Sequence, residues 1–192
     1  MIKEYIEQAE NILLEEFSVL PFRSNIIYYD NLQTFLHKNG LNTKGESAYT
    51  PKDLTAHLPK GNLEDILPLV YHEYHGHGTF CEFSMYGQKL VANERIYDRL
   101  DYEQKIKFVP KAQEYFEAVK PYFEGFAIWM EEFLLTKSGK KDLWKLRKEK
   151  SKAMPLDFQH SYFEAYSMLK NYEKRKGTDA LWRKVGFFGG KK

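Results

Sequence analysis

The sequence predicts an α+β fold that is mostly helical, with a small sheet confined to residues 20–60. Three observations predict it. The run SNIIYYD, residues 24–30, is β-branched and aromatic, as strands are. Two prolines exclude a helix from the turn-rich segment 45–61. From Thr79 onward the patterns are helical only. Because hydrophobic residues make up 43% of the 192 residues, we expect one domain with a substantial core.

The first elements follow from periodicity and helix capping. Apolar side chains recur at helical spacing over residues 2–17, so this segment is predicted to be an amphipathic helix. A strand at 24–30 follows. Asp30 is then placed to cap a helix that runs through His37 and is closed by Gly40.

The segment 45–61 is predicted to hold one or two short strands. Pro51 and Pro59 would confine these strands to an edge of the sheet, because proline cannot donate to a strand ladder. Asn62 is placed to cap the next helix, whose first turn carries two acidic residues, as the helix dipole prefers. Pro68 either kinks this helix or marks its start.

The rest of the chain is predicted to be helical, without repeats or low-complexity segments. In the segment PYFEGFAIWMEEFLL, proline stands at the first helical position and Gly139 lies beyond the end. The helices are expected at about 80–99, 111–119, 121–135, 156–176 and 178–185.

Charge and composition narrow the classes of function. The net charge is only +2, although residues 137–192 carry 16 Lys and Arg against 6 Asp and Glu. We interpret this basic third as solvated helix faces, and we expect no nucleic-acid partner, because no arginine-rich tract is interleaved with stacking aromatics. The oligomeric state stays open.

The location is expected to be cytoplasmic. Cys81 is the one cysteine, so no intrachain disulfide can form, which fits a reducing compartment. The N-terminus alternates apolar and charged residues, unlike a signal peptide. We expect no membrane partner, because the sequence has no run of about 18 apolar residues.

Half of the six histidines lie in the stretch LVYHEYHGHGTFCE, residues 69–82. Zinc needs imidazole or carboxylate ligands that converge, and the usual helical solution places two histidines four apart. Here that position is Gly76. His72 and His77 are five apart, which leaves them about 140° apart on a regular helix. A one-residue π-bulge would bring them onto one face, and Gly76 lies inside the segment that must deform.

The residues from His72 to Gly78 read H-E-x-x-G-H-G, which resembles the H-E-x-x-x-H motif of dipeptidyl peptidase III, a gluzincin zinc metallopeptidase. The match covers about seven contiguous residues and a downstream glutamate, and the chain is far shorter than that enzyme. The resemblance implies one Zn²⁺ per chain, held by His72 and His77, with Glu73 as catalytic base and His75 off the metal. It also implies a minimal zincin-like catalytic domain over residues 1–192.

In that reading the domain has an N-terminal lobe of about 1–78 and a helical C-terminal lobe of about 79–192. Gluzincins take a third ligand from a second helix, and the candidate is Glu124 in YFEGFAIWMEE, which resembles the E-G-aromatic-A stretch of several gluzincin families. That segment departs from the E-E-x-R-A-E motif of dipeptidyl peptidase III.

An independent argument supports a ligand in this helix. Residues 121–135 are apolar nearly all round, so the helix is buried, and a carboxylate there is costly unless paired or bound to metal. Glu124 and Glu131 are seven apart and share a face. We interpret Glu124 as the ligand and Glu131 as the acceptor for the outer nitrogen of a ligand histidine, with the swapped assignment open. Cys81 or Glu82 could also reach the metal if the helix continues.

The resulting prediction is a hydrolase that cleaves peptide or protein substrates with a water activated by Glu73. Tyr162, and after it His160, are the candidates for stabilising the oxyanion. From zincin architecture, the substrate would lie extended along a sheet edge within 47–58. Two alternatives remain: a non-catalytic metal-binding or interaction domain, and a zinc amidase that acts on a non-peptide amide.

Overall fold

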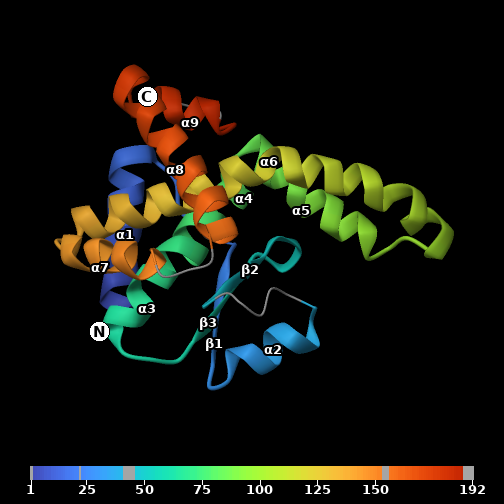
Figure 1. Cartoon of the computed structure of the whole chain (residues 1–192), viewed down its shortest axis with the longest axis horizontal. Coiled ribbons are helices and arrows are strands. Elements are labelled where there is room, and N and C mark those ends of the chain that lie inside the picture. Colours follow the sequence, from blue (N-terminus) through green and yellow to red (C-terminus); the bar gives the residue numbers. More distant parts are fainter. Residues whose placement is uncertain (1, 22, 41–45, 153–155, 188–192) are drawn as a thin grey trace.

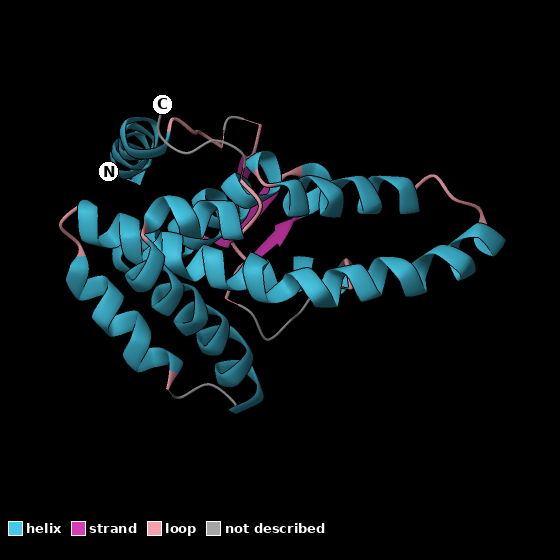
Figure 2. Cartoon of the chain, turned by 90° about the horizontal axis from the view of Figure 1, so that it is seen from above, coloured by secondary structure: helices cyan, strands magenta, loops and turns pink. Residues whose placement is uncertain are grey.

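The computed structural model describes residues 2–21, 23–40, 46–152 and 156–187, with the backbone alone for 156–162. Helices surround a small three-stranded sheet, so the predicted α+β, mostly helical class is confirmed. Most helices gather in one body beside the sheet, and a helical hairpin projects from this body (Figure 1). Seen from above, the hairpin still projects (Figure 2).

The elements occur in the following order along the chain. The strands are β1 (Asn25–Tyr29), β2 (Ala48–Thr50) and β3 (Thr55–Pro59). The helices are α1 (Ile2–Phe17), α2 (Leu32–Lys38), the 3₁₀ turn η1 (Pro51–Asp53), α3 (Leu63–Val70), the π-helix η2 (Tyr71–His77), α4 (Gly78–Phe83), α5 (Met85–Tyr97), α6 (Tyr102–Lys137), α7 (Lys141–Ser151), α8 (Leu156–Lys176) and α9 (Thr178–Lys184).

The sheet has the strand order β1-β3-β2, with β1 parallel and β2 antiparallel to β3. All three strands lie within residues 20–60, as predicted. The prediction that proline confines the later strands to an edge is wrong for β3, which is central. Pro59 is tolerated because it ends the strand and Lys60 donates its N–H to the carbonyl of Tyr29 instead, at 2.9 Å. Strand β2 is the outer strand.

The capping predictions are partly confirmed. The side chain of Asn62 accepts a hydrogen bond from the N–H of Asp65, so it caps α3 as predicted. Helix α3 begins at Leu63, so Pro68 lies inside it and does not mark its start. Helix α2 is capped by Asn31 and not by Asp30, because the Asn31 side chain accepts from Thr34.

The helices after Thr79 differ from the prediction in three places. The expected helix 80–99 is divided at Ser84, whose extended backbone ends α4 and whose hydroxyl caps α5. The expected helices 111–119 and 121–135 are parts of the 36-residue helix α6, which continues through Pro110 and Pro121. Helix α7 was not predicted. Helices α1, α8 and α9 lie where they were expected.

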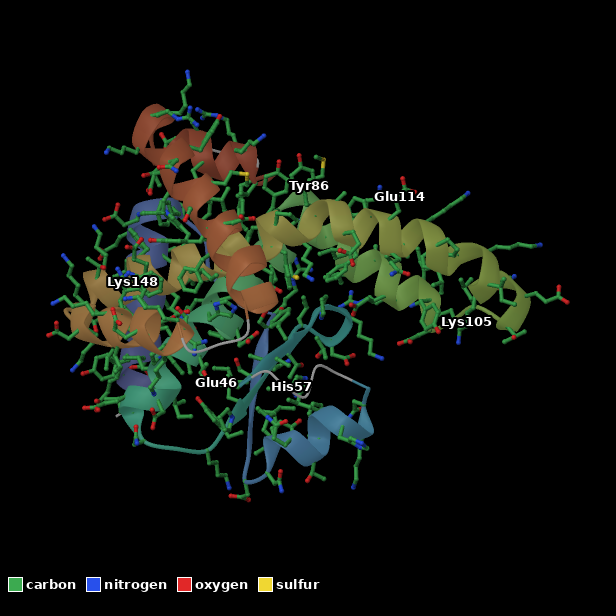
Figure 3. All side chains as sticks on the ribbon, viewed as in Figure 1. Glu46, His57, Tyr86, Lys105, Glu114 and Lys148 are labelled. Carbon is green, nitrogen blue, oxygen red and sulfur yellow. The ribbon has the colours of Figure 1, made fainter. Side chains whose placement is uncertain are left out.

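Helix α6 has two parts with different surroundings. Its second part is buried in the core, where Phe126, Trp129 and Met130 are inaccessible to solvent or nearly so. Its first part forms the projecting hairpin with α5, and Figure 3 places Lys105 and Glu114 on this hairpin, away from the sheet. Within the described residues, no helix combines the length and the apolar character that crossing a membrane requires.

Candidate metal centre

The histidine cluster lies on a π-helix, as the sequence predicted. Helix η2 spans Tyr71–His77 and is buried along its whole length. The N–H of Gly78 bonds to the carbonyl of Glu73, five residues earlier, which is the π-helical pattern. The wider turn brings His72 and His77 onto one face, with their ring centroids 4.9 Å apart. The predicted break in the α-helix between these two residues is therefore confirmed.

Two glycines let three backbones meet beside the site. A Cβ atom on Gly76 would lie 2.7 Å from Cα of Ala127 in α6, and one on Gly125 would lie 2.9 Å from the carbonyl carbon of Ala165 in α8. Gly125 and Ala127 belong to the stretch E-G-F-A, so its small residues admit η2 on one side and α8 on the other. Gly76 is thus needed for close approach to α6.

The π-helix and α6 together form a compact group of three ligand-type side chains. One ligand atom from each of His72, His77 and Glu124 lies within 4.8 Å of the other two. Glu124 Oε2 is 3.8 Å from Nε2 of His72 and 3.5 Å from Nε2 of His77. A tetrahedral zinc site separates its nitrogen and oxygen ligands by about 3.3 Å, so small adjustments would complete one. This buried group can hold a metal ion.

The electrostatics of the three residues fit a cation between them. Burial lowers the pKa of His72, but hydrogen bonds to Glu124 and Glu131 outweigh it and raise the pKa to about 10. Burial raises the pKa of Glu124, but His77 and His72 outweigh it and lower the pKa to about 2. Glu124 is therefore ionised, and a positive charge in the group is strongly favoured, whether it is a proton or a metal.

The outer nitrogen of His72 faces a second carboxylate of α6. Nδ1 of His72 lies 3.3 Å from Oε2 of Glu131, which is the position expected of an acceptor that orients the ring. The other oxygen of Glu131, Oε1, lies 3.5 Å from Nε of Arg147 in α7. Arg147 also forms an ion pair with Glu46. Burial lowers the pKa of Arg147, but the charges of Glu131 and Glu46 outweigh it and raise the pKa.

The predicted base, Glu73, is buried beside the group and points toward β2. Its Oε1 accepts a hydrogen bond of 2.6 Å from the hydroxyl of Ser47, and its Oε2 lies 3.8 Å from Nε2 of His77. Tyr49 of β2 packs near His77, with ring centroids 5.9 Å apart. The outer strand, which lies within the predicted segment 47–58, is therefore the strand next to the site.

Three neighbours of the motif lie outside the ligand group. His75 is inaccessible to solvent among Tyr71 and Tyr74, and burial lowers its pKa to about 3, so its ring is neutral. Glu82 accepts from the hydroxyl and the N–H of Ser24. Cys81 is buried, and burial raises the pKa of its thiol. The described ligand group includes neither Cys81 nor Glu82.

The site also contains residues that sequence reasoning missed. Phe123 stacks on His77 with a centroid distance of 3.8 Å, and Ser47 and Arg147 contact the two flanking glutamates. A stacked aromatic beside Glu124 could have been inferred from adjacency, whereas nothing local distinguishes Arg147 from the surrounding lysines. The predicted oxyanion residues His160 and Tyr162 fall in α8 but outside the described side chains.

Comparison with protein-family models, with curated proteins and with solved structures finds no match for this chain. The arguments about function therefore rest on the residues and their geometry.

Proposed function

We propose that this protein is a zinc-dependent metallopeptidase. The observation that carries the proposal is the buried group of His72, His77 and Glu124 with the carboxylate of Glu73 beside it. Two imidazoles and one carboxylate are the ligand set of a catalytic zinc site, which leaves one position open. The resemblance of H-E-x-x-G-H to a gluzincin motif points to the same reaction.

Each residue then has a distinct role. His72 and His77 would hold the metal through Nε2, and Glu124 would hold it through a carboxylate oxygen. Zinc bound there would act as a Lewis acid that acidifies a water and polarises a carbonyl. Glu73 would take the proton of the attacking water and later deliver it to the leaving amine. The hydroxyl of Ser47 holds Oε1 of Glu73, which leaves Oε2 directed toward the ligands.

The substrate class follows from the position of β2. This strand pairs with β3 on one edge only, and its residues contact η2. An extended peptide could add to its other edge through main-chain hydrogen bonds and so bring a peptide carbonyl past Glu73. The lone cysteine fits a reducing compartment such as the cytoplasm.

Burial favours a second candidate function, a metal-binding module without turnover. His72, Glu73 and His77 are only 7%, 5% and 3% exposed, which leaves a substrate little access unless the segments around the site move. Against this candidate, a purely structural metal site would have no use for a carboxylate held beside its ligands.

One experiment separates the two candidates. Elemental analysis of purified protein would establish the metal, and a peptide library would be tested on the parent chain and on Glu73→Gln. For a peptidase, the variant keeps metal and fold while hydrolysis falls by about 10²–10⁴-fold. Glu149→Gln, on the exposed face of α7, is the matched control and should hydrolyse like the parent. A metal-loaded parent that cleaves no peptide would refute peptidase activity.

A further inference from the structure

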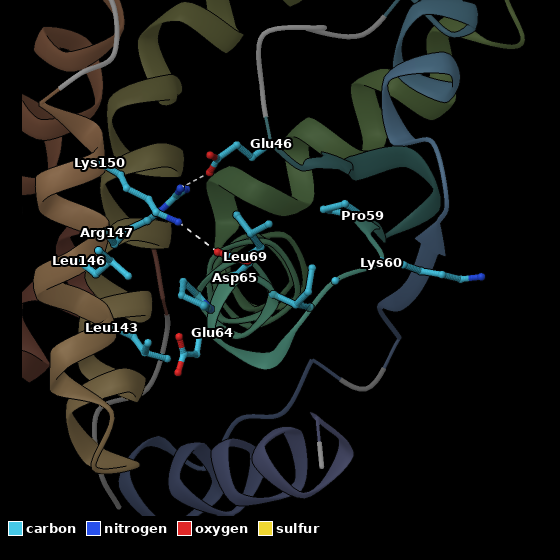
Figure 4. Close-up of a pocket in the computed structure, with 13 residues that line it drawn as sticks. Glu46, Pro59, Lys60, Glu64, Asp65, Leu69, Leu143, Leu146, Arg147 and Lys150 are labelled. Atoms are coloured by element: carbon cyan, nitrogen blue, oxygen red, sulfur yellow. Dashed lines mark hydrogen bonds and ion pairs between the residues drawn. The ribbon is translucent and has the colours of Figure 1, made fainter.

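Helix α7 supplies one side chain to the surroundings of the metal centre. Arg147 lies on the wall of a pocket of about 230 Å³ between α3 and α7 (Figure 4). Its guanidinium reaches past this pocket toward α6, where Nε lies 3.5 Å from Oε1 of Glu131. On the outer side it pairs with Glu46, whose side chain is about half exposed. Arg147 thus links the surface to a carboxylate that contacts His72.

The carboxylate of Glu131 needs a cation when the metal is bound. Its side chain is 2% exposed, and an ionised carboxylate at such a site is costly unless it is paired. A histidine that binds a metal through one nitrogen is neutral, so His72 can donate a hydrogen bond from Nδ1 but supplies no formal charge. Arg147 supplies that charge from the other side of the carboxylate.

We infer that Arg147 is a positioning residue of the metal centre, which acts by keeping Glu131 ionised and aimed at Nδ1 of His72. An ionised acceptor fixes the ring orientation of His72 and increases the basicity of the ligand nitrogen. Without the guanidinium, Glu131 would be buried without its cation, so it would take up a proton or turn away. The contact chain Arg147–Glu131–His72 therefore ties α7 to metal affinity.

The test measures metal affinity by competition between the protein and a chromophoric zinc chelator. Arg147→Met should weaken zinc binding by about 10–100-fold, the usual cost of losing such an outer contact. Arg147→Lys keeps a charge and should recover part of the loss. Lys150→Met is the matched control: it lies on the same helix and the same pocket, but it pairs with Asp65 and should bind zinc like the parent.

A double-mutant cycle shows whether Arg147 acts through Glu131. In a Glu131→Gln background, Arg147→Met should change zinc affinity by less than about twofold, because the carboxylate it serves is gone. The absorption spectrum of bound Co²⁺ gives a second readout, and it should change in Arg147→Met but not in Lys150→Met. If Arg147→Met does not fold, Arg147→Gln, which removes the charge but keeps a donor, carries the same expectations.

The outcomes distinguish this inference from the function on which it rests. It depends on the metal site of the proposed peptidase but not on peptide hydrolysis. Parental affinity in Arg147→Met, or an undiminished loss in the Glu131→Gln background, would overturn the role of Arg147 alone. A parent chain that binds neither Zn²⁺ nor Co²⁺ would overturn the proposed function as well.

Discussion

Replacing Gly76 with alanine tests whether the packing of η2 on α6 sets the metal site. The added Cβ would lie 2.7 Å from Cα of Ala127 and 3.1 Å from its carbonyl oxygen. These are backbone atoms of a buried helix, so no side chain can rotate away. Ordinary contact begins near 3.4 Å, so the two helices must separate by about 0.7 Å at this point.

The displacement has two consequences of different size. Overpacking of a core costs about 1–3 kcal/mol, and the helix propensity of alanine over glycine returns up to about 1 kcal/mol. A net loss of about 1–2 kcal/mol lowers the Tm of a chain this long by about 2–8 °C. The effect on metal is larger, because His77 on η2 and Glu124 on α6 move apart from 3.5 Å, whereas a metal site tolerates errors of about 0.2 Å.

We therefore expect Gly76→Ala to fold and to lose at least about 10-fold in zinc affinity. Calorimetry of the metal-free protein and chelator competition would measure the two effects. Gly61→Ala is the control, because its Cβ would meet only side-chain atoms of Ile66, at 3.2 Å and beyond. Parental zinc affinity in Gly76→Ala would show that the site does not depend on this contact and would refute the packing argument.

Three further predictions concern the ligands. His77→Ala should abolish stoichiometric metal in elemental analysis, whereas His75→Leu should keep it, because the neutral ring of His75 faces two tyrosines; the reverse pattern would exclude the five-residue pair. Zinc binding at pH 8 should release about one proton, since His72 has a pKa of about 10 without metal; calorimetry in buffers of different ionisation enthalpy would detect it, and no release would contradict a protonated His72. In urea unfolding of metal-free protein, the His72 contribution should be complete below pH 6.5 and lost as the pH rises through about 10, and the Glu124 contribution complete above pH 4.5 and lost as the pH falls through about 2, so a flat profile in both ranges would refute the pairing.

The part of the site that the sequence predicted depends on local geometry. Five residues turn a regular helix through about 500°, so histidines at 72 and 77 could share a face only if the helix widened. That arithmetic needs no tertiary information, and η2 has the expected form. The sheet was confined to the correct segment for a similar reason, because prolines and β-branched runs act locally.

The elements that were missed depend on tertiary contacts and solvent. Helix α6 continues through Pro110 and Pro121 because the carbonyls they leave without a donor belong to Ile106 and Glu117, which are exposed and can bond to water. Helix α7 is highly charged and buries few side chains, Trp144 among them, so its apolar periodicity is weak. Arg147 became visible as part of the site only when α7 was placed against α6.

The choice between Glu124 and Glu131 shows what three dimensions add to spacing. Both carboxylates lie on one face of α6, two turns and about 10 Å apart along the helix, so spacing alone left their roles exchangeable. In the structure, the ring of His72 lies between them, with Nε2 toward Glu124 and Nδ1 toward Glu131. Rotating this ring would exchange the two nitrogens, but it would not move His77, whose Nε2 also faces Glu124. A metal held by both histidines therefore has Glu124 within reach, whereas the use of Glu131 would require α6 to slide by two turns.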